Sequence, residues 1–143
     1  TLPPLGIVIV LSRFTRLMEK ELAAVIELFR PLTVVVILIA SVLAGLGEEA
    51  LFRGVMQDAL AGWAGTAVAV VIVSILFGLI HFISLHYVIY VFALGIYLGG
   101  IYAYTDNLVV PATIHFLYDF LAILYGVHFL GVDSDDDPKH DPV

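Results

Sequence analysis

Apolar residues occur in long runs along the chain, and three or four of these runs are long enough to be transmembrane helices. A helix that crosses a membrane needs about 20 mostly apolar residues. The runs cover approximately residues 32–60, 66–82, 87–104 and 111–130. Most of them are bounded by glycine, proline or polar residues, which favour turns. The pattern therefore predicts an all-α fold, a polytopic transmembrane helix bundle.

The segments on either side of this core have a different character. Residues 1–11 are apolar but too short to span a membrane alone, and they fit the end of a preceding helix. Residues 12–30 hold four of the six basic residues opposite an apolar stripe, which is typical of an interfacial amphipathic helix on the cytoplasmic side. We therefore divide the chain into residues 1–31, a transmembrane core at 32–131, and an acidic tail at 132–143 that we expect to be disordered.

Composition narrows the possible functions. Hydrophobic residues make up 62% of the chain and charged residues 13%, with a mean hydropathy of +1.07. A soluble domain has about 45–50% apolar and about 25% charged residues. These values exclude a soluble enzyme and a nucleic-acid-binding protein, and the lack of cysteine excludes a disulfide scaffold. Because the chain begins with Thr1, we expect it to be a piece of a longer protein.

Six ionisable side chains nevertheless fall inside the predicted spans. An Asp, Lys or Arg at the centre of a transmembrane helix costs about 2.5–3.5 kcal/mol. Three charged groups would thus cost about 10 kcal/mol, which is comparable to the whole stability of a typical domain. We therefore expect these side chains to pair with one another or to line a wet cavity. They are Glu48, Glu49, Arg53, His81, His115 and Asp119.

The spacing of these residues favours pairing but leaves one conflict. A helical hairpin that turns near residues 64–65 places His81 level with Glu48. If the later helices are full antiparallel spans, however, His115 lies near one face of the membrane and His81 nearer the other. A tilted or broken helix, or a deeper position for His81, would be needed to bring the two imidazoles together.

Two further pairs are four residues apart and so share one face of a helix. Glu49 and Arg53 are in the favoured order, with the acid first. Their interpretation stays open between a buried structural ion pair and a direct role with substrate. His115 and Asp119 have the same spacing on the last helix.

Three short motifs contain all six residues. EEALFRG at residues 48–54 fits E-E-x-x-x-R, FGLIH at 77–81 fits F-x-x-x-H, and HFLYD at 115–119 is a variant of H-x-x-x-N. In this order and inside apolar helices, the motifs resemble those of the CAAX-protease and bacteriocin-processing family of intramembrane endopeptidases. The resemblance covers roughly residues 45–124, and it departs from the family pattern at Asp119, where asparagine is commonest.

The resemblance implies an active-site cavity inside the bilayer and hydrolysis of peptide bonds. Glu48 and His81 would activate a water molecule, and His115 with Asp119 would stabilise the oxyanion. The implied partners are the lipid bilayer and a peptide or membrane-protein substrate. For a family member of this composition we expect a multi-pass location in the cytoplasmic membrane of a prokaryote. CAAX is a family label here, because nothing in the chain shows that a prenylated C-terminus is recognised.

Elementary chemistry leads to the same reaction with two possible mechanisms. The chain has no cysteine and no Gly-x-Ser-x-Gly elbow, so a water nucleophile with a carboxylate base remains, without a cofactor. Alternatively, Glu48, His81 and His115 would supply the ligands of a catalytic zinc ion. Asp119 is a better metal ligand than asparagine, which strengthens the zinc alternative, although we expect the metal-free mechanism. Without a metal, Asp119 must be protonated or must orient His115, because an ionised carboxylate would repel the oxyanion.

Two non-proteolytic functions also fit the pattern. Glutamate and histidine inside a membrane mark ion pathways, which suggests a transport or proton-relay module. Gly95 and Gly99 form a Gly-x-x-x-Gly face that allows close contact between helices. A scaffold that binds partner helices through this face is the other alternative.

Overall fold

The structure is a computed structural model that describes residue 23 and residues 26–129. In this part of the chain all regular secondary structure is helical, which confirms the all-α prediction. The predicted end of a preceding helix (1–11), most of the amphipathic helix (12–30) and the acidic tail (132–143) lie outside the described residues. The helices are α2 (Val34–Glu49), η1 (Ala50–Gln57), α3 (Asp58–Ala64), α4 (Thr66–Ile80), α5 (Leu85–Thr105) and α6 (Val109–Phe129).

The first three elements form one continuous helix of 31 residues, Val34–Ala64. It begins after Thr33, whose hydroxyl oxygen accepts a hydrogen bond from the Val36 backbone N–H. As the apolar periodicity predicted, the helix runs on past Glu48 and Glu49. The sequence did not predict its middle part, η1, where the wider turns of a π-helix bring the N–H of Asp58 to the carbonyl of Arg53, five residues earlier. π-Helical segments are rare and are frequent at functional sites.

Three helices are long and apolar enough to cross a membrane, and α4 is shorter. The three are Val34–Ala64, Leu85–Thr105 and most of α6. The 15 residues of α4 rise about 22 Å, whereas the hydrocarbon core of a bilayer is about 30 Å thick. The helix ends at Ile80 because His81 has left the helical conformation (φ −93°, ψ 24°). The chain is thus a multi-pass membrane protein in which His81 stands at the end of a short helix.

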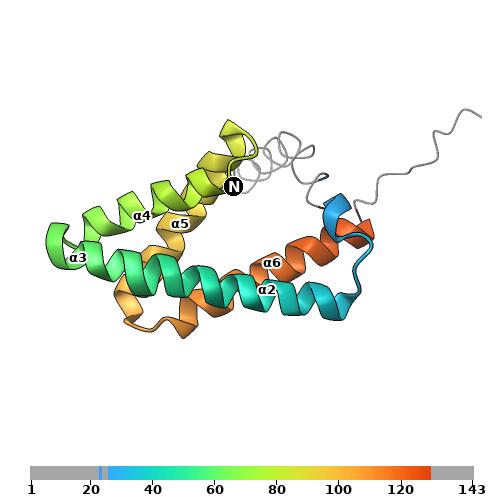
Figure 1. Ribbon diagram of the computed structural model, residues 1–143, viewed down its shortest axis with the longest axis horizontal. Helices are drawn as coiled ribbons and strands as arrows, with labels where there is room; N and C mark the ends of the chain where they lie inside the picture. Colours follow the sequence, from blue (N-terminus) through green and yellow to red (C-terminus); the bar gives the residue numbers. More distant parts are fainter. Residues whose placement is uncertain (1–22, 24–25, 130–143) are drawn as a thin grey trace, which may run out of the picture.

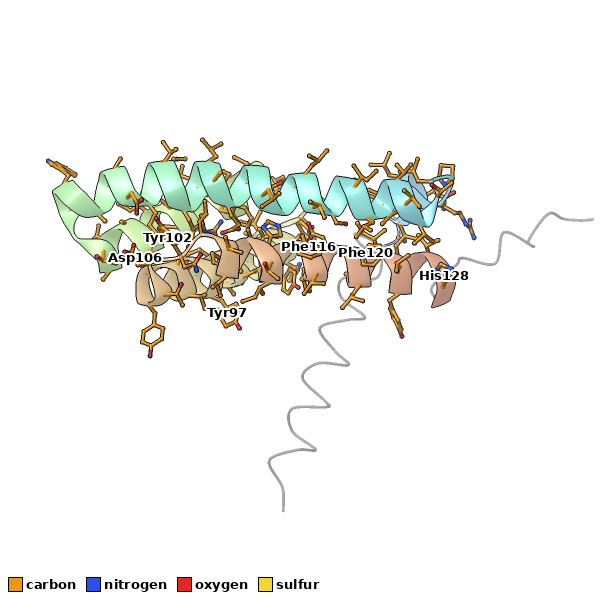
Figure 2. The ribbon with its side chains drawn as sticks, turned by 90° about the horizontal axis from the view of Figure 1, so that it is seen from below. Tyr97, Tyr102, Asp106, Phe116, Phe120 and His128 are labelled. Carbon is orange, nitrogen blue, oxygen red and sulfur yellow. The ribbon has the colours of Figure 1, made fainter. Side chains whose placement is uncertain are left out.

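The helices form two antiparallel pairs, α2 with α6 and α4 with α5 (Figure 1). Glycines allow the close approach within each pair. A Cβ at Gly45 of α2 would lie 2.8 Å from the Cβ of Phe116, which is on the side of α6 that faces α2 (Figure 2). Gly78 of α4 lies in the same way against the backbone of Val88 in α5.

The Gly95/Gly99 face is occupied from within the chain. A Cβ at Gly95 would lie 3.0 Å from the side chain of Ser74, and one at Gly99 would lie 2.8 Å from Oε1 of Gln57. Close helix contact through this face is therefore confirmed. A scaffold that binds partner helices through the same face is not compatible with the structure, because η1 and α4 already cover it.

The conflict over His81 and His115 arose from the assumption that all the later helices are full antiparallel spans, and α4 is too short for that. On α5, Gly99 is level with Gln57, which bonds to its carbonyl. The next helix starts nearer to the middle of the long helix, because Leu108 lies against Gly54. Two turns into α6, His115 therefore reaches the level of Glu49 on the long helix.

Candidate active site

Glu48 lies between the imidazoles of His81 and His115. Its Oε2 is 3.5 Å from Nε2 of His81 and 3.9 Å from Nε2 of His115. The same Nε2 of His115 is also 3.4 Å from Oδ2 of Asp119. Residues from α2, α6 and the end of α4 thus form one acid–imidazole cluster.

A second carboxylate, Glu49, lies behind this cluster. Its Oε1 accepts a hydrogen bond from Arg53 (3.0 Å) and another from Nδ1 of His115 (2.8 Å). Arg53 also donates to the carbonyl of Gly95 on α5 (3.1 Å), and its guanidinium lies 4.6 Å from the centre of the Phe77 ring. Glu49 and Arg53 thus connect the long helix to α4, α5 and α6.

The six side chains separate into an open side and a buried side. The side chains of Glu48, His81 and Asp119 are 30%, 28% and 28% exposed. Those of Glu49 and Arg53 are 0% and 1% exposed, and that of His115 is 5% exposed. Glu48, His81 and Asp119 are therefore partly exposed at the surface of the bundle, whereas Glu49 and Arg53 contact only protein.

The phenylalanine of the F-x-x-x-H motif supports the cluster. The Phe77 ring is almost completely buried, and its centre lies 4.7 Å from that of His81 and 5.9 Å from that of His115. It also makes an edge-on contact with Phe52 of η1 at 5.0 Å. Phe77 thus forms an apolar surface against which both imidazoles pack.

The end of α4 determines which nitrogen of His81 carries a proton. Nδ1 of His81 is 2.8 Å from the backbone carbonyl of Phe77. A carbonyl oxygen only accepts hydrogen bonds, so Nδ1–H is the donor. In a neutral imidazole, Nε2 is then unprotonated and faces Glu48 as an acceptor.

Gln57 is a further buried polar side chain on the same helix, although no motif contains it. It is 2% exposed, and its Nε2 donates to the carbonyl of Gly99 (3.0 Å). The signal in the sequence was its position, four residues after Arg53 and eight after Glu49. A hydrogen bond between the hydroxyls of Tyr90 and Tyr118, which joins α5 to α6, had no such signal.

The part of the chain that the structure describes contains no preformed zinc site. Among residue 23 and residues 26–129, no group of three or more His, Cys, Asp or Glu side chains is arranged to hold a metal ion. Both nitrogens of His115 already face carboxylates, Nδ1 that of Glu49 and Nε2 that of Asp119. We therefore derive the chemistry below from the side chains alone.

Fold and site together define a class of protein. The chain is an all-helical, multi-pass membrane protein with an acid–imidazole cluster between its helices. A family model described as type II CAAX prenyl endopeptidase Rce1-like matches residues 30–121. The chain belongs to this family, and the match confirms the resemblance that the three motifs indicated.

The comparison with curated proteins adds one relative. The Bacillus subtilis (strain 168) protein YpbD, described as uncharacterized, is 36% identical over 86 residues, which are 58% of this chain. These residues are 41% of YpbD, so the chain spans less than half the length of this relative. No solved structure matches the chain significantly.

Proposed function

We propose that the chain is the catalytic part of an intramembrane endopeptidase in which Glu48 and His81 activate a water molecule. The observation that carries this proposal is the position of Oε2 of Glu48, within 3.9 Å of Nε2 of both His81 and His115. Two acceptors, a carboxylate oxygen and the unprotonated Nε2 of His81, face each other at 3.5 Å. A water molecule beside this pair can donate one proton to each of the two atoms.

The reaction follows from this arrangement. The water oxygen attacks the carbonyl carbon of the scissile peptide bond, and its proton passes to Glu48 as general base. The carbonyl oxygen becomes an oxyanion in the tetrahedral intermediate. When the C–N bond breaks, Glu48 returns the proton to the leaving amine, and the products are a carboxylic acid and an amine.

His115 is the proposed donor to the oxyanion. Its Nδ1–H is held by Glu49, so Nε2 points toward Glu48 and the open side of the cluster. When Nε2 is protonated as well, His115 is an imidazolium with one remaining N–H, which faces the Asp119 carboxylate in the structure and would be taken over by the oxyanion as its negative charge develops. The contact between Asp119 and His115 supports an orienting role for Asp119.

Glu49 and Arg53 are proposed to position His115 rather than to contact substrate. Both are buried, and Glu49 accepts hydrogen bonds from Arg53 and His115 through one oxygen. A ligating or catalytic histidine is commonly oriented by a carboxylate at its other nitrogen. This favours the structural side of the two interpretations that the sequence left open.

The proposed substrate is a peptide or membrane protein that reaches the site within the bilayer of a prokaryotic cytoplasmic membrane. The three membrane-spanning helices and the Bacillus relative support this location. Whether the substrate carries a prenyl group is tested best with matched C-terminal peptides that differ only in that group.

The test is cleavage of a peptide library by the purified chain in detergent or lipid. Glu48→Gln keeps the shape of the side chain but removes the base, so turnover should fall to background while the protein stays folded. Glu27→Gln is the matched control, because Glu27 is exposed and pairs with Arg30, three residues further along the chain. Full activity of Glu48→Gln, or ion flux in liposomes that needs Glu48 without any proteolysis, would contradict the proposal.

The metal question has its own measurement. We propose a metal-free mechanism, so elemental analysis of active protein should find zinc well below one ion per chain, and a chelator should leave turnover unchanged. Stoichiometric zinc that is lost together with activity would instead establish the zinc-dependent version, with Glu48, His81 and His115 as its proposed ligands.

A further inference from the structure

The buried polar atoms that lack a hydrogen-bond partner are concentrated on one segment. Within residue 23 and residues 26–129, these side-chain atoms are Glu48 Oε2, Glu49 Oε2, Arg53 Nε and Gln57 Oε1. They all lie between residues 48 and 57, at the end of α2 and along η1. We call the three fully buried members, Glu49, Arg53 and Gln57, the polar row.

Leaving these atoms unpaired would be costly. A buried donor or acceptor without a partner costs about 1–3 kcal/mol, and more when it is charged. The whole stability of a typical domain is about 5–15 kcal/mol. Because the atoms of the polar row lie on successive turns of one helix, we expect one kind of ligand to form hydrogen bonds with all of them.

The side chains cannot simply turn to satisfy their free atoms. Arg53 is held by Glu49 and by the carbonyl of Gly95, and Gln57 is held by the carbonyl of Gly99. Each side chain therefore uses one part of its polar group for a bond to protein and leaves the other part directed into the interior. Rotation would break the bonds to α5.

Water is the ligand that matches the free atoms. They consist of one donor, the Nε–H of Arg53, and two acceptors, Glu49 Oε2 and Gln57 Oε1. A water molecule accepts from the first and donates to the others, and buried waters typically make about three hydrogen bonds to such groups. A metal cation is a poorer match, because the guanidinium of Arg53 would repel it.

The polar row extends from the acid–imidazole cluster at one end to an exposed polar pair at the other. At one end it adjoins Glu48, which is on the open side of the acid–imidazole cluster. At the other end Gln57 is followed by exposed Asp58, which accepts a hydrogen bond from the hydroxyl of Tyr102 (2.8 Å). Figure 2 shows Tyr102 at this end of the molecule, near α3.

We propose that the polar row binds a short chain of ordered water molecules and supplies the hydrolytic water to Glu48 from the α3 end of the molecule. A hydrolase inside a bilayer needs such a supply, because its surroundings are apolar. The binding of water depends only on the structure, whereas its use in hydrolysis rests on the proposed function.

The binding is tested by a high-resolution crystal structure of the full chain grown from lipid. Ordered water within hydrogen-bonding distance of at least two of the atoms Glu49 Oε2, Arg53 Nε and Gln57 Oε1 is the expected result. If these atoms are paired with protein groups, or are in contact with dry apolar side chains, the proposal is overturned. This result does not depend on any activity of the protein.

The supply is tested by kinetics. Gln57→Met retains the length of the side chain but removes its amide, and we expect kcat to fall about tenfold with KM unchanged. Val55→Met is the matched control, because Val55 is on the same segment but 60% exposed. If folded Gln57→Met has the kcat of the wild type, the proposal that the polar row supplies the hydrolytic water is overturned. If the wild type shows no Glu48-dependent cleavage at all, the proposed function fails, and the crystal structure alone decides the water site.

A second pair of variants leaves Gln57 itself in place. Gly99→Ala puts a Cβ 2.8 Å from Oε1 of Gln57 and should displace the amide, so kcat should fall in the same direction. Gly100→Ala meets nothing within 4 Å and should have no effect. Equal kcat values for folded Gly99→Ala and Gly100→Ala would contradict the supply.

Discussion

Glu49 is the residue on which the internal order of the site depends. It bonds to Arg53 on its own helix and to His115 on α6, and none of its surface is exposed. A buried ion pair adds little stability compared with apolar residues of the same size, but breaking it leaves an uncompensated charge in the interior. The pair is therefore better understood as a device for orienting His115 than as a source of stability.

This interpretation predicts a characteristic double-mutant cycle. Arg53→Met should destabilise the protein by about 3–5 kcal/mol, because it leaves the Glu49 carboxylate buried without its cation. Adding Glu49→Met to that variant should recover part of the loss. Unfolding free energies in mixed detergent micelles measure both effects, and losses that simply add would show that the two side chains do not act as a pair.

At the scale of elements, the contact between α2 and α6 depends on one glycine. A Cβ at Gly45 would lie 2.8 Å from the Cβ and 2.9 Å from the backbone nitrogen of Phe116. Backbone atoms cannot move aside as the tip of a side chain can, so the two helices would have to separate. This contact holds His115, one residue before Phe116, at the level of Glu49.

We therefore expect Gly45→Ala to lower the free energy of unfolding by about 1–3 kcal/mol, as overpacked positions usually do. Gly47→Ala on the same helix is the control, because a Cβ there meets nothing within 4 Å. Its effect should be neutral or slightly stabilising, by up to about 1 kcal/mol from helix propensity. Detergent-induced unfolding compares the two variants, and equal destabilisation would mean that the close approach of α2 and α6 has no energetic importance.

The π-helical segment is the element that local sequence did not reveal. The apolar residues through this segment recur at the spacing of an ordinary α-helix, so nothing local predicted the wider turns. The difference lies in tertiary bonds, since Arg53 and Gln57 in η1 donate to the carbonyls of Gly95 and Gly99 in α5. The spacing of four residues places the members of the polar row on one face of the helix, and the packing of α5 against it makes that face buried.

At the scale of the whole molecule, the long helix determines the topology in the membrane. Its 31 residues rise about 46 Å, which exceeds the hydrocarbon thickness of about 30 Å. Its two ends should therefore be exposed on opposite sides. The loop between α5 and α6 is at the same end as α3, as the position of Asp106 in Figure 2 shows.

Single cysteines can test this topology, because the chain has none of its own. Gly62→Cys in α3 and Asn107→Cys in the α5–α6 loop should react with a membrane-impermeant maleimide from the same side of sealed vesicles. Thr33→Cys, at the start of α2, should react only from the other side. Labelling of Gly62→Cys and Asn107→Cys from opposite sides would be incompatible with the arrangement in Figure 1.

Much of the architecture was predictable from local composition. A membrane-spanning helix satisfies its own backbone hydrogen bonds, so apolar length alone identifies it, and the helices occur where the runs predicted them. The cost of ionisable groups in lipid likewise singled out the six side chains, since it depends on residue type and not on neighbours. The pairing of Glu49 with Arg53 was also local, as the two are one turn apart.

The geometry of the site depends instead on packing between distant segments. Glu49 and His115 are separated by 66 positions, and whether they meet is decided by where α6 begins along the long helix. That offset, the early end of α4 and the wide turns of η1 result from contacts between helices, which hydropathy and spacing do not encode. Hence the sequence by itself identified the side chains capable of the chemistry. Only the packing of the helices decided that Glu48 and His81 lie on the open side of the site and that Glu49 and Arg53 are buried.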